Sequence, residues 1–158
     1  MIKRCLSAAI AAVVFTQTPT SAFAANVEFD SIVATSCSIV VTRNGTLGTY
    51  DNARTLESKT EASYGLATVT ATGQNFRINQ YAPTGFLTRP AADTHPDFGY
   101  LAKIRSSGAT NFNWSTQTNG QPLNAGVSDI KISFRAQKFI GKSFANGEYT
   151  AVVILSCE

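Results

Sequence analysis

The chain consists of short apolar runs separated by clusters of turn residues, and no segment sustains the 3.6-residue period of an amphipathic helix. The clearest pattern lies in residues 127–139. There, apolar side chains occupy the even positions from Ile130 to Ala136, and polar side chains such as Asp129 and Lys131 occupy the odd positions. A period of two with one polar face is typical of an antiparallel sheet with one side in water.

Six other runs rich in β-branched and aromatic residues are bounded by Gly, Asn, Pro and Ser, which is the pattern of strands joined by turns. Residues 88–97 contain two prolines and are predicted to form a loop without core residues. About seven strands at this spacing predict an all-β fold, an immunoglobulin-like β-sandwich of short antiparallel strands. The predicted strands are 27–41, 61–72, 75–81, 98–105, 111–117, 127–139 and 149–155.

The N-terminus has the features of a secretory signal peptide. Lys3 and Arg4 precede an apolar run at residues 6–15, and Ala22 and Ala24 form a small-residue cleavage site. We therefore predict that residues 1–24 are removed and that residues 25–158 form one secreted domain. No later segment approaches the roughly 20 apolar residues of a transmembrane helix, so we expect no membrane insertion.

Charge gives no sign of a polyanionic partner. The chain has 13 basic and 10 acidic residues, and removal of Lys3 and Arg4 leaves 11 basic residues and a net charge of about +1. A domain this close to neutrality produces no strong field for nucleic acid or anionic lipid. We expect no nucleic-acid partner.

Two cysteines, Cys37 and Cys157, lie after the predicted cleavage site. In an oxidising compartment such a pair favours a disulfide over two free thiols. A zinc site would need more ligands than two thiols and the single histidine, His95, supply. We expect no metal site and no cofactor.

Catalysis has little support in the sequence. Asp93, His95 and Asp97 alternate in an extended segment, where they are able to converge on a divalent ion or to serve an enzyme. Polar residues beside prolines are more typical of a solvated loop, and the chain has no Gly-x-Ser-x-Gly or comparable nucleophile motif. We therefore predict that the protein is not an enzyme.

A binding module is the alternative that the aromatic residues support. Trp114, Tyr81 and Tyr100 would form a stacking platform for a sugar if the fold brought them together. Aromatic side chains in the core or at the rim of a sandwich explain the same residues. A self-contained secreted β-sandwich that binds carbohydrate is the second functional hypothesis.

Several stretches, in this order, resemble the chaperone–usher pilin subunits, and in particular their spore-coat-protein-U-like secreted members. The stretch "VEFDSIVATSCSIV" is similar to their first strand, "NGTLGTYDN" to the stretch after it, and "GEYTAVVIL" to their last strand. The stretches "ASYGLATVTATGQNFRINQYAP" and "FGYLAKIRSSGATNFNW" resemble the strands between. The resemblance covers most of residues 25–158.

The resemblance implies a structural subunit of a surface fibre that supports adhesion or biofilm formation. Such subunits resemble immunoglobulin domains that lack the C-terminal strand. A periplasmic chaperone, and then the N-terminal extension of another subunit delivered by an usher, fills the groove beside the last strand. The protein would pass through the periplasm to the cell surface. The expected groove residues are Tyr149, Ala151, Val152, Val153, Ile154 and Leu155, and the possible donor strand presents Val27, Phe29, Ser31 and Val33.

Two features depart from the family pattern. These pilins usually pair the first-strand cysteine with one on the second strand, but the corresponding stretch "TVTATGQ" has none, which leaves Cys157 for Cys37. That bond would close a loop of about 120 residues, stabilise the fold by roughly 4–5 kcal/mol, and narrow one end of the groove. In addition, only residues 25–36 precede Cys37, and they are needed either as a donor strand or as the first strand of the domain.

Overall fold

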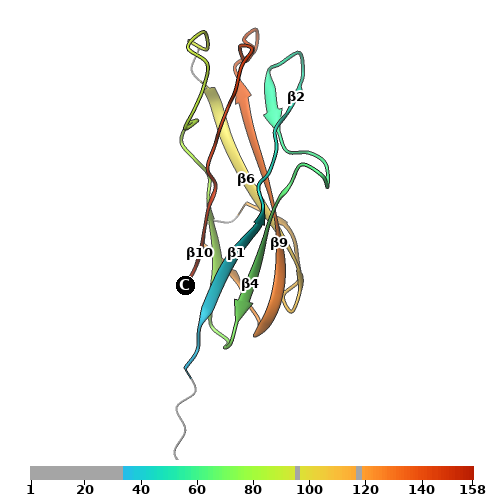
Figure 1. Ribbon diagram of the computed structural model, residues 1–158, viewed down its shortest axis with the longest axis vertical. Coiled ribbons are helices and arrows are strands. Elements are labelled where there is room, and N and C mark those ends of the chain that lie inside the picture. Colours follow the sequence, from blue (N-terminus) through green and yellow to red (C-terminus); the bar gives the residue numbers. More distant parts are fainter. Residues whose placement is uncertain (1–33, 95–96, 117–118) are drawn as a thin grey trace, which may run out of the picture. The chain divides into compact units, whose positions relative to one another are not determined.

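Ten β-strands form the regular structure of the protein, and no helix occurs among residues 34–94, 97–116 and 119–158, which the computed structural model describes (Figure 1). All strand pairings are antiparallel, so the fold is an all-β, sandwich-like arrangement, as predicted. The strands are β1 (Cys37–Arg43), β2 (Gly48–Tyr50), β3 (Thr55–Glu57), β4 (Gly65–Ala71), β5 (Arg77–Tyr81), β6 (Asp97–Gly108), β7 (Phe112–Ser115), β8 (Gln121–Pro122), β9 (Gly126–Lys138) and β10 (Ile154–Cys157).

The strand with the clearest alternation, β9, is the centre of a seven-stranded sheet. One side of β9 pairs first with β4 and then with β3, while the other side pairs with β6 along almost its whole length. The short hairpin of β2 and β3 and the first strand, β1, therefore share one flank of this sheet, and β7 closes the other flank. Ile130, Phe134 and Ala136 are buried, which confirms the predicted apolar face of β9.

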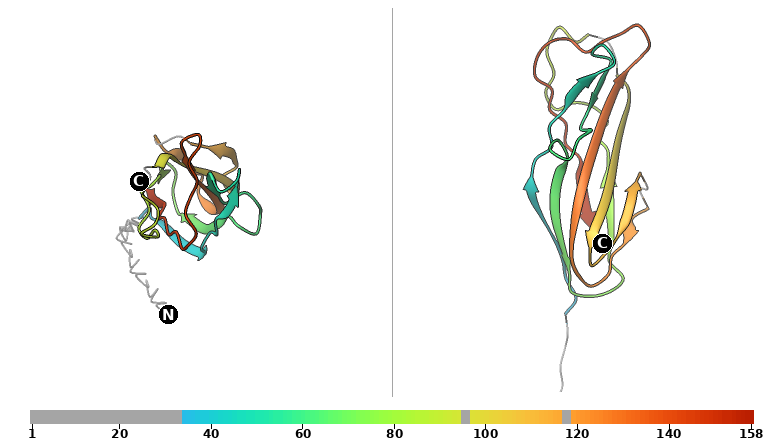
Figure 2. Two further views of the ribbon diagram at one scale, coloured as in Figure 1. Left: turned by 90° about the horizontal axis from the view of Figure 1, so that it is seen from above. Right: turned by 90° about the vertical axis from the view of Figure 1, so that its right-hand side faces the viewer.

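The smaller sheet contains β10, β5 and β8 in that order. β10 pairs with β5 from Ile154, opposite Tyr81, to Cys157, opposite Ile78. Earlier in the C-terminal segment, Thr150 forms an isolated bridge with Thr88. The C-terminal segment thus lies along β5 and the segment that follows it, and in the right-hand view of Figure 2 it lies behind the larger sheet.

Two apolar clusters form the core, and β9 contributes to both because its length spans the sheet. The first cluster is centred on Ile78, Ile104 and Ile130, which are almost fully buried. The second is centred on Phe134 and Phe144, with Phe86 in edge-to-face contact with both rings. The half-buried side chains around them include residues of β1 and of the C-terminal segment.

A disulfide joins Cys37 of β1 to Cys157 of β10, with a Cα–Cα distance of 6.2 Å. This confirms the predicted pairing of the two cysteines. Because β1 belongs to the larger sheet and β10 to the smaller one, the bond links the two sheets across a sequence separation of 120 residues.

Two local predictions were wrong, and a third is only partly described. Residues 61–64 are not part of a strand, because Thr60 and Ser63 bond each other through backbone and hydroxyl groups in a turn, and the strand begins at Gly65. Of the strand predicted at residues 27–41, residues 34–36 precede β1, and residues 27–33 lie outside the described residues. The loop at residues 88–97 was predicted to have no core residue, yet Asp93 is buried.

Candidate functional site: the free edge of the C-terminal segment

The side chains of residues 149–157 alternate between the core and the surface, in the two faces that the sequence predicted. Tyr149, Ala151 and Val153 pack against the second apolar cluster, and Leu155 and Cys157 pack against the first. On the opposite face, the side chains of Val152 and Ile154 are 52% and 58% exposed. The strand itself is shorter than predicted, since only Ile154–Cys157 forms a continuous ladder.

The backbone of the same segment alternates in its hydrogen bonding. Thr150 N–H donates to the Thr88 carbonyl at 3.0 Å, and Glu158 N–H donates to the Arg77 carbonyl at 3.0 Å. Thr150, Glu158 and the even-numbered residues of β10 therefore bond towards β5 and its extension. In an extended strand, neighbouring residues direct their N–H and C=O groups to opposite sides. In β10, Leu155 therefore directs its groups away from β5, and the alternation of the side chains of residues 149–155 indicates the same direction for Ala151 and Val153.

We call this side the C-terminal edge, meaning the N–H and C=O groups of Ala151, Val153 and Leu155. Among the described residues, none forms a backbone hydrogen bond with these groups. An open strand edge is able to pair with a further strand. The apolar side chains of the same three residues lie beneath this edge and are only half-buried.

β1 presents a second edge of the same kind. Within the described part of the chain, β1 pairs with β4 alone, and Thr72 N–H donates to the Ser36 carbonyl at 2.9 Å, so even-numbered residues of β1 bond towards β4. Ile39 and Val41 consequently direct their backbone groups away from β4; we call these groups the β1 edge. The Ile39 side chain packs against the first apolar cluster, and that of Val41 is 64% exposed.

The disulfide brings the two edges together at one end only. β1 runs away from Cys37, whereas the C-terminal segment runs towards Cys157, and the two segments separate beyond the bond (Figures 1 and 2). β1 and β10 share no ladder among the described residues. Two open edges with apolar side chains between them thus extend from a closed end at the disulfide to an open end near Tyr149.

A buried ion pair fixes the open end. Lys138 Nζ lies 2.6 Å from Asp93 Oδ1, and the two side chains are 0% and 1% exposed. Tyr149 OH donates to Asp93 Oδ2 at 2.9 Å, and the Lys138 ammonium lies 4.8 Å from the centre of the Phe144 ring. The start of the C-terminal segment is therefore anchored to β9 through Asp93. Sequence reasoning missed this group because Asp93 was considered only as a loop or metal-binding residue.

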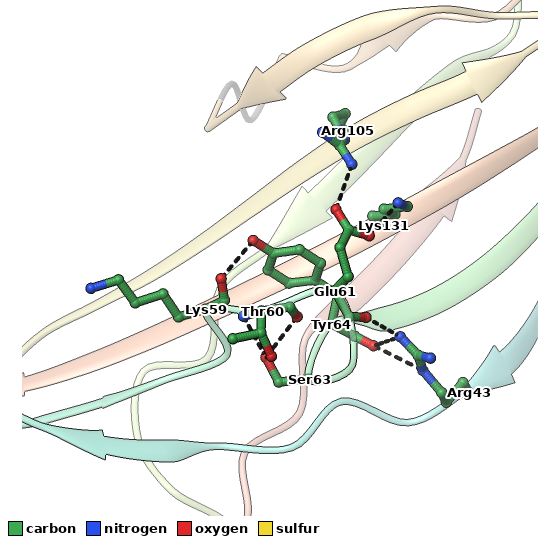
Figure 3. A network of polar contacts seen from close by, with 8 residues as sticks. All are labelled: Arg43, Lys59, Thr60, Glu61, Ser63, Tyr64, Arg105 and Lys131. Carbon is green, nitrogen blue, oxygen red and sulfur yellow. Dashed lines mark hydrogen bonds and ion pairs between the residues drawn. The ribbon is translucent and has the colours of Figure 1, made fainter.

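A surface network fixes the far end of β1 (Figure 3). Arg43 donates hydrogen bonds to the carbonyl oxygens of Glu61 and Tyr64, and the Glu61 carboxylate binds Arg105, at 3.0 Å, and Lys131. The hydrogen bond from Lys131, together with the positive charges of Lys131 and Arg105, lowers the pKa of Glu61 below its ordinary value of 4.5. The loop that carries Glu61 is thereby held on β6 and β9.

The three aromatic residues of the alternative hypothesis lie in three different environments. Tyr100 stacks on Phe134 in the second apolar cluster, and Tyr81 is exposed on β5. Trp114 contacts the Tyr64 ring, with centroids 4.9 Å apart, and the Arg105 guanidinium. The ring contacts of the described residues thus place Trp114 beside Tyr64 and Tyr100 beside Phe134, and they include no pair among Trp114, Tyr81 and Tyr100.

The predicted acidic and histidine group is only partly described. Asp93 is engaged by Lys138 and Tyr149, His95 lies outside the described residues, and the backbone of Asp97 begins β6. No cluster of three or more His, Cys, Asp or Glu side chains suited to a metal ion occurs in the described ranges. Within the same ranges, no helix has the length and apolarity that a membrane crossing requires.

The predicted signal peptide and the possible donor residues Val27, Phe29, Ser31 and Val33 lie outside the described residues. Comparison of the chain with protein-family models, curated proteins and solved structures finds no match. The candidate site therefore depends on its own geometry: two open strand edges, half-buried apolar side chains between them, and a disulfide at one end.

Proposed function

We propose that the protein is a structural subunit of a secreted surface fibre, a pilin-like domain that accepts an extended segment of another chain along its C-terminal edge. The observation that carries this proposal is the coincidence of unbonded amides and half-buried apolar side chains at Ala151, Val153 and Leu155. A strand added there would bond these amides and cover these side chains in a single step.

The order of the strands supports the proposal. An immunoglobulin-like sandwich places its strands A, B, E and D in one sheet and C, F and G in the other. The order β1-β4-β9-β6 corresponds to A-B-E-D, and the pair β5 and β10 corresponds to C and F. The position of strand G, beside β10 on the side away from β5, is the C-terminal edge.

The chemistry of the edge explains why a partner would be required. Exposed apolar side chains and unpaired strand edges favour aggregation in water, and proteins normally cover them. In the proposed function, a periplasmic chaperone strand covers the C-terminal edge first. A segment of another pilin subunit, delivered by an usher, then replaces it in the fibre.

Amide hydrogen exchange tests the proposal residue by residue. In the monomer, the amides of Ala151 and Val153 should exchange rapidly, and in the assembled protein they should exchange about 100-fold more slowly, because exchange then requires release of the partner strand. The amide of Thr150, which already bonds Thr88, is the internal control and should change little. Equal exchange of Ala151 and Val153 in monomer and assembly would exclude strand addition at this edge.

A carbohydrate-binding module is the second candidate, and one surface feature favours it. A hollow of about 470 Å³ on β6, β7 and β9 is lined by Arg105, Lys131, Asn111 and Asn113, among others. The Arg105 guanidinium also lies over the Trp114 ring, 5.2 Å from its centre. Binding to a glycan array that disappears with Trp114→Ala would support this candidate. Failure of the wild-type protein to bind any glycan on the array would remove it.

A further inference from the structure

We propose that the Cys37–Cys157 disulfide is the end-stop of the strand-accepting site, which excludes the chain's own N-terminal segment and leaves the N-terminal segment of a second copy as the occupant. This inference rests on the proposed function, because it concerns the same edge. It assigns to the disulfide a role in choosing the partner, in addition to its contribution to stability.

At the disulfide, the site is too narrow to admit a strand. Neighbouring strands lie about 4.8 Å apart, so a strand inserted between two others requires about 9.6 Å between them. The Cα atoms of Cys37 and Cys157 are 6.2 Å apart. No strand passes between β1 and β10 at this point while the disulfide is intact.

The disulfide blocks the direct route by which the chain's own N-terminal segment would enter the site. Residues 34–36 precede Cys37 and continue along β4, since Thr72 N–H donates to the Ser36 carbonyl and Thr35 lies against Gly73. This path leaves the domain at the closed end of the site. A segment that turned back from there would have to pass the disulfide to reach Leu155.

An indirect route, along the outside of the domain to the open end of the site, is too long for the chain's own N-terminal segment. If the chain is cut after Ala24, residues 25–33 span about 31 Å when fully extended, at ~3.4 Å per residue. The path from Cys157 to Tyr149 is about 27 Å at the same rise, and the segment would need this length twice, once outside and once within the site. Residues 25–33 are therefore too short to fill their own C-terminal edge.

The segment of a second copy meets neither obstacle. It enters at the open end, near Tyr149, while the body of its own domain remains outside. Its N-terminal end therefore points towards the disulfide, and it lies antiparallel to the C-terminal segment. Residues 27–33 and residues 149–155 each contain seven residues. If residues 27–33 were extended in the site, the alternation of their side chains would direct Val27, Phe29 and Val33 to one face, towards the half-buried side chains of the site.

The experiment compares three forms of the full chain after signal removal: wild type, wild type treated with a phosphine reductant, and Cys37→Ser/Cys157→Ser. Near-UV circular dichroism of Trp114 verifies that each form is folded. Light scattering after size-exclusion chromatography gives the ratio of oligomer to monomer at about 10 μM. The competitor is a synthetic peptide of residues 25–35, and the matched control is the same peptide with Phe29→Asp.

We expect the wild type to form oligomers that the peptide, but not its Phe29→Asp control, converts to monomers. Without the disulfide, the gap is free to widen and the chain's own segment can fold back. An intramolecular segment acts at an effective concentration of about 1 mM, so the ratio of oligomer to monomer should fall about 100-fold in the reduced and serine forms.

Two other outcomes have distinct meanings. If all folded forms oligomerise equally and the peptide dissociates each of them, the end-stop is overturned while strand acceptance stands. If the wild type is a stable monomer that does not bind the peptide, the segment of a second copy is not the occupant and the end-stop inference fails, whereas the proposed function is decided by the amide-exchange experiment. If the serine variant does not fold, the reduced wild type decides between the same outcomes. If neither form folds, the end-stop inference is overturned, and the disulfide serves only to stabilise the fold.

Discussion

Removal of Asp93 tests whether the buried ion pair anchors the C-terminal segment. Asp93→Ala leaves the Lys138 ammonium without its carboxylate at a position where the side chain is 0% exposed, and it removes one acceptor of the Tyr149 hydroxyl. Removal of one member of a buried ion pair typically costs about 3–5 kcal/mol, because the remaining charge has no compensation. We expect a loss of more than about 1 kcal/mol for Asp93→Ala, because the two side chains are 0% and 1% exposed and the Lys138 ammonium stays buried.

The measurement is the free energy of unfolding in urea, followed by the fluorescence of Trp114, the only tryptophan. The matched control is Asp93→Val/Lys138→Met, which replaces both charges with apolar side chains of comparable size. We expect this double variant to lie within about 1 kcal/mol of the wild type, because paired removal leaves no buried charge. The reasoning is refuted if Asp93→Ala costs less than about 1 kcal/mol, or if the double variant costs as much as the single one.

Three further predictions concern Glu61, the disulfide and one turn. Because the pKa of Glu61 is lowered in the folded state, its stabilising effect is present above the unfolded pKa and is lost as pH falls through the folded pKa. The stability difference between wild type and Glu61→Gln in urea should accordingly be larger at pH 7 than at pH 3, and a constant difference would contradict the assignment. Cys37→Ser/Cys157→Ser should lower the free energy of unfolding by about 4–5 kcal/mol, whereas no change in the urea midpoint would show that the bond constrains little. Gly108→Ala should cost more than about 1 kcal/mol, because φ is +103° and the new Cβ would lie 2.7 Å from the Val127 carbonyl oxygen, and Gly99→Ala is the control because its Cβ meets nothing within 4 Å. Equal thermal midpoints for these two alanine variants would remove the steric argument.

The fold class was accessible from the sequence because strand formation depends on a local pattern. The alternation of Ile130, Ile132 and Phe134 with polar neighbours needs only the period of two, and the structure places these residues on β9 as expected. The disulfide was accessible for a different reason: after the predicted cleavage, only Cys37 and Cys157 remain. The two faces of residues 149–157 also followed from alternation alone.

The tertiary structure alone decided how these elements meet. No local pattern in the sequence predicts the ion pair between Asp93 and Lys138. The two side chains attract each other only after the loop at residues 88–97 packs against β9 and both side chains are buried. The same holds for the different environments of Trp114 and Tyr100, and for the turn at Thr60 and Ser63, because of which the predicted strand begins only at Gly65. The sequence by itself determined which side chains of the C-terminal segment are apolar and which two cysteines pair. Only the tertiary structure decided that the backbone groups of Ala151 and Val153 lie on the unpaired side, because that depends on which strand occupies the other side.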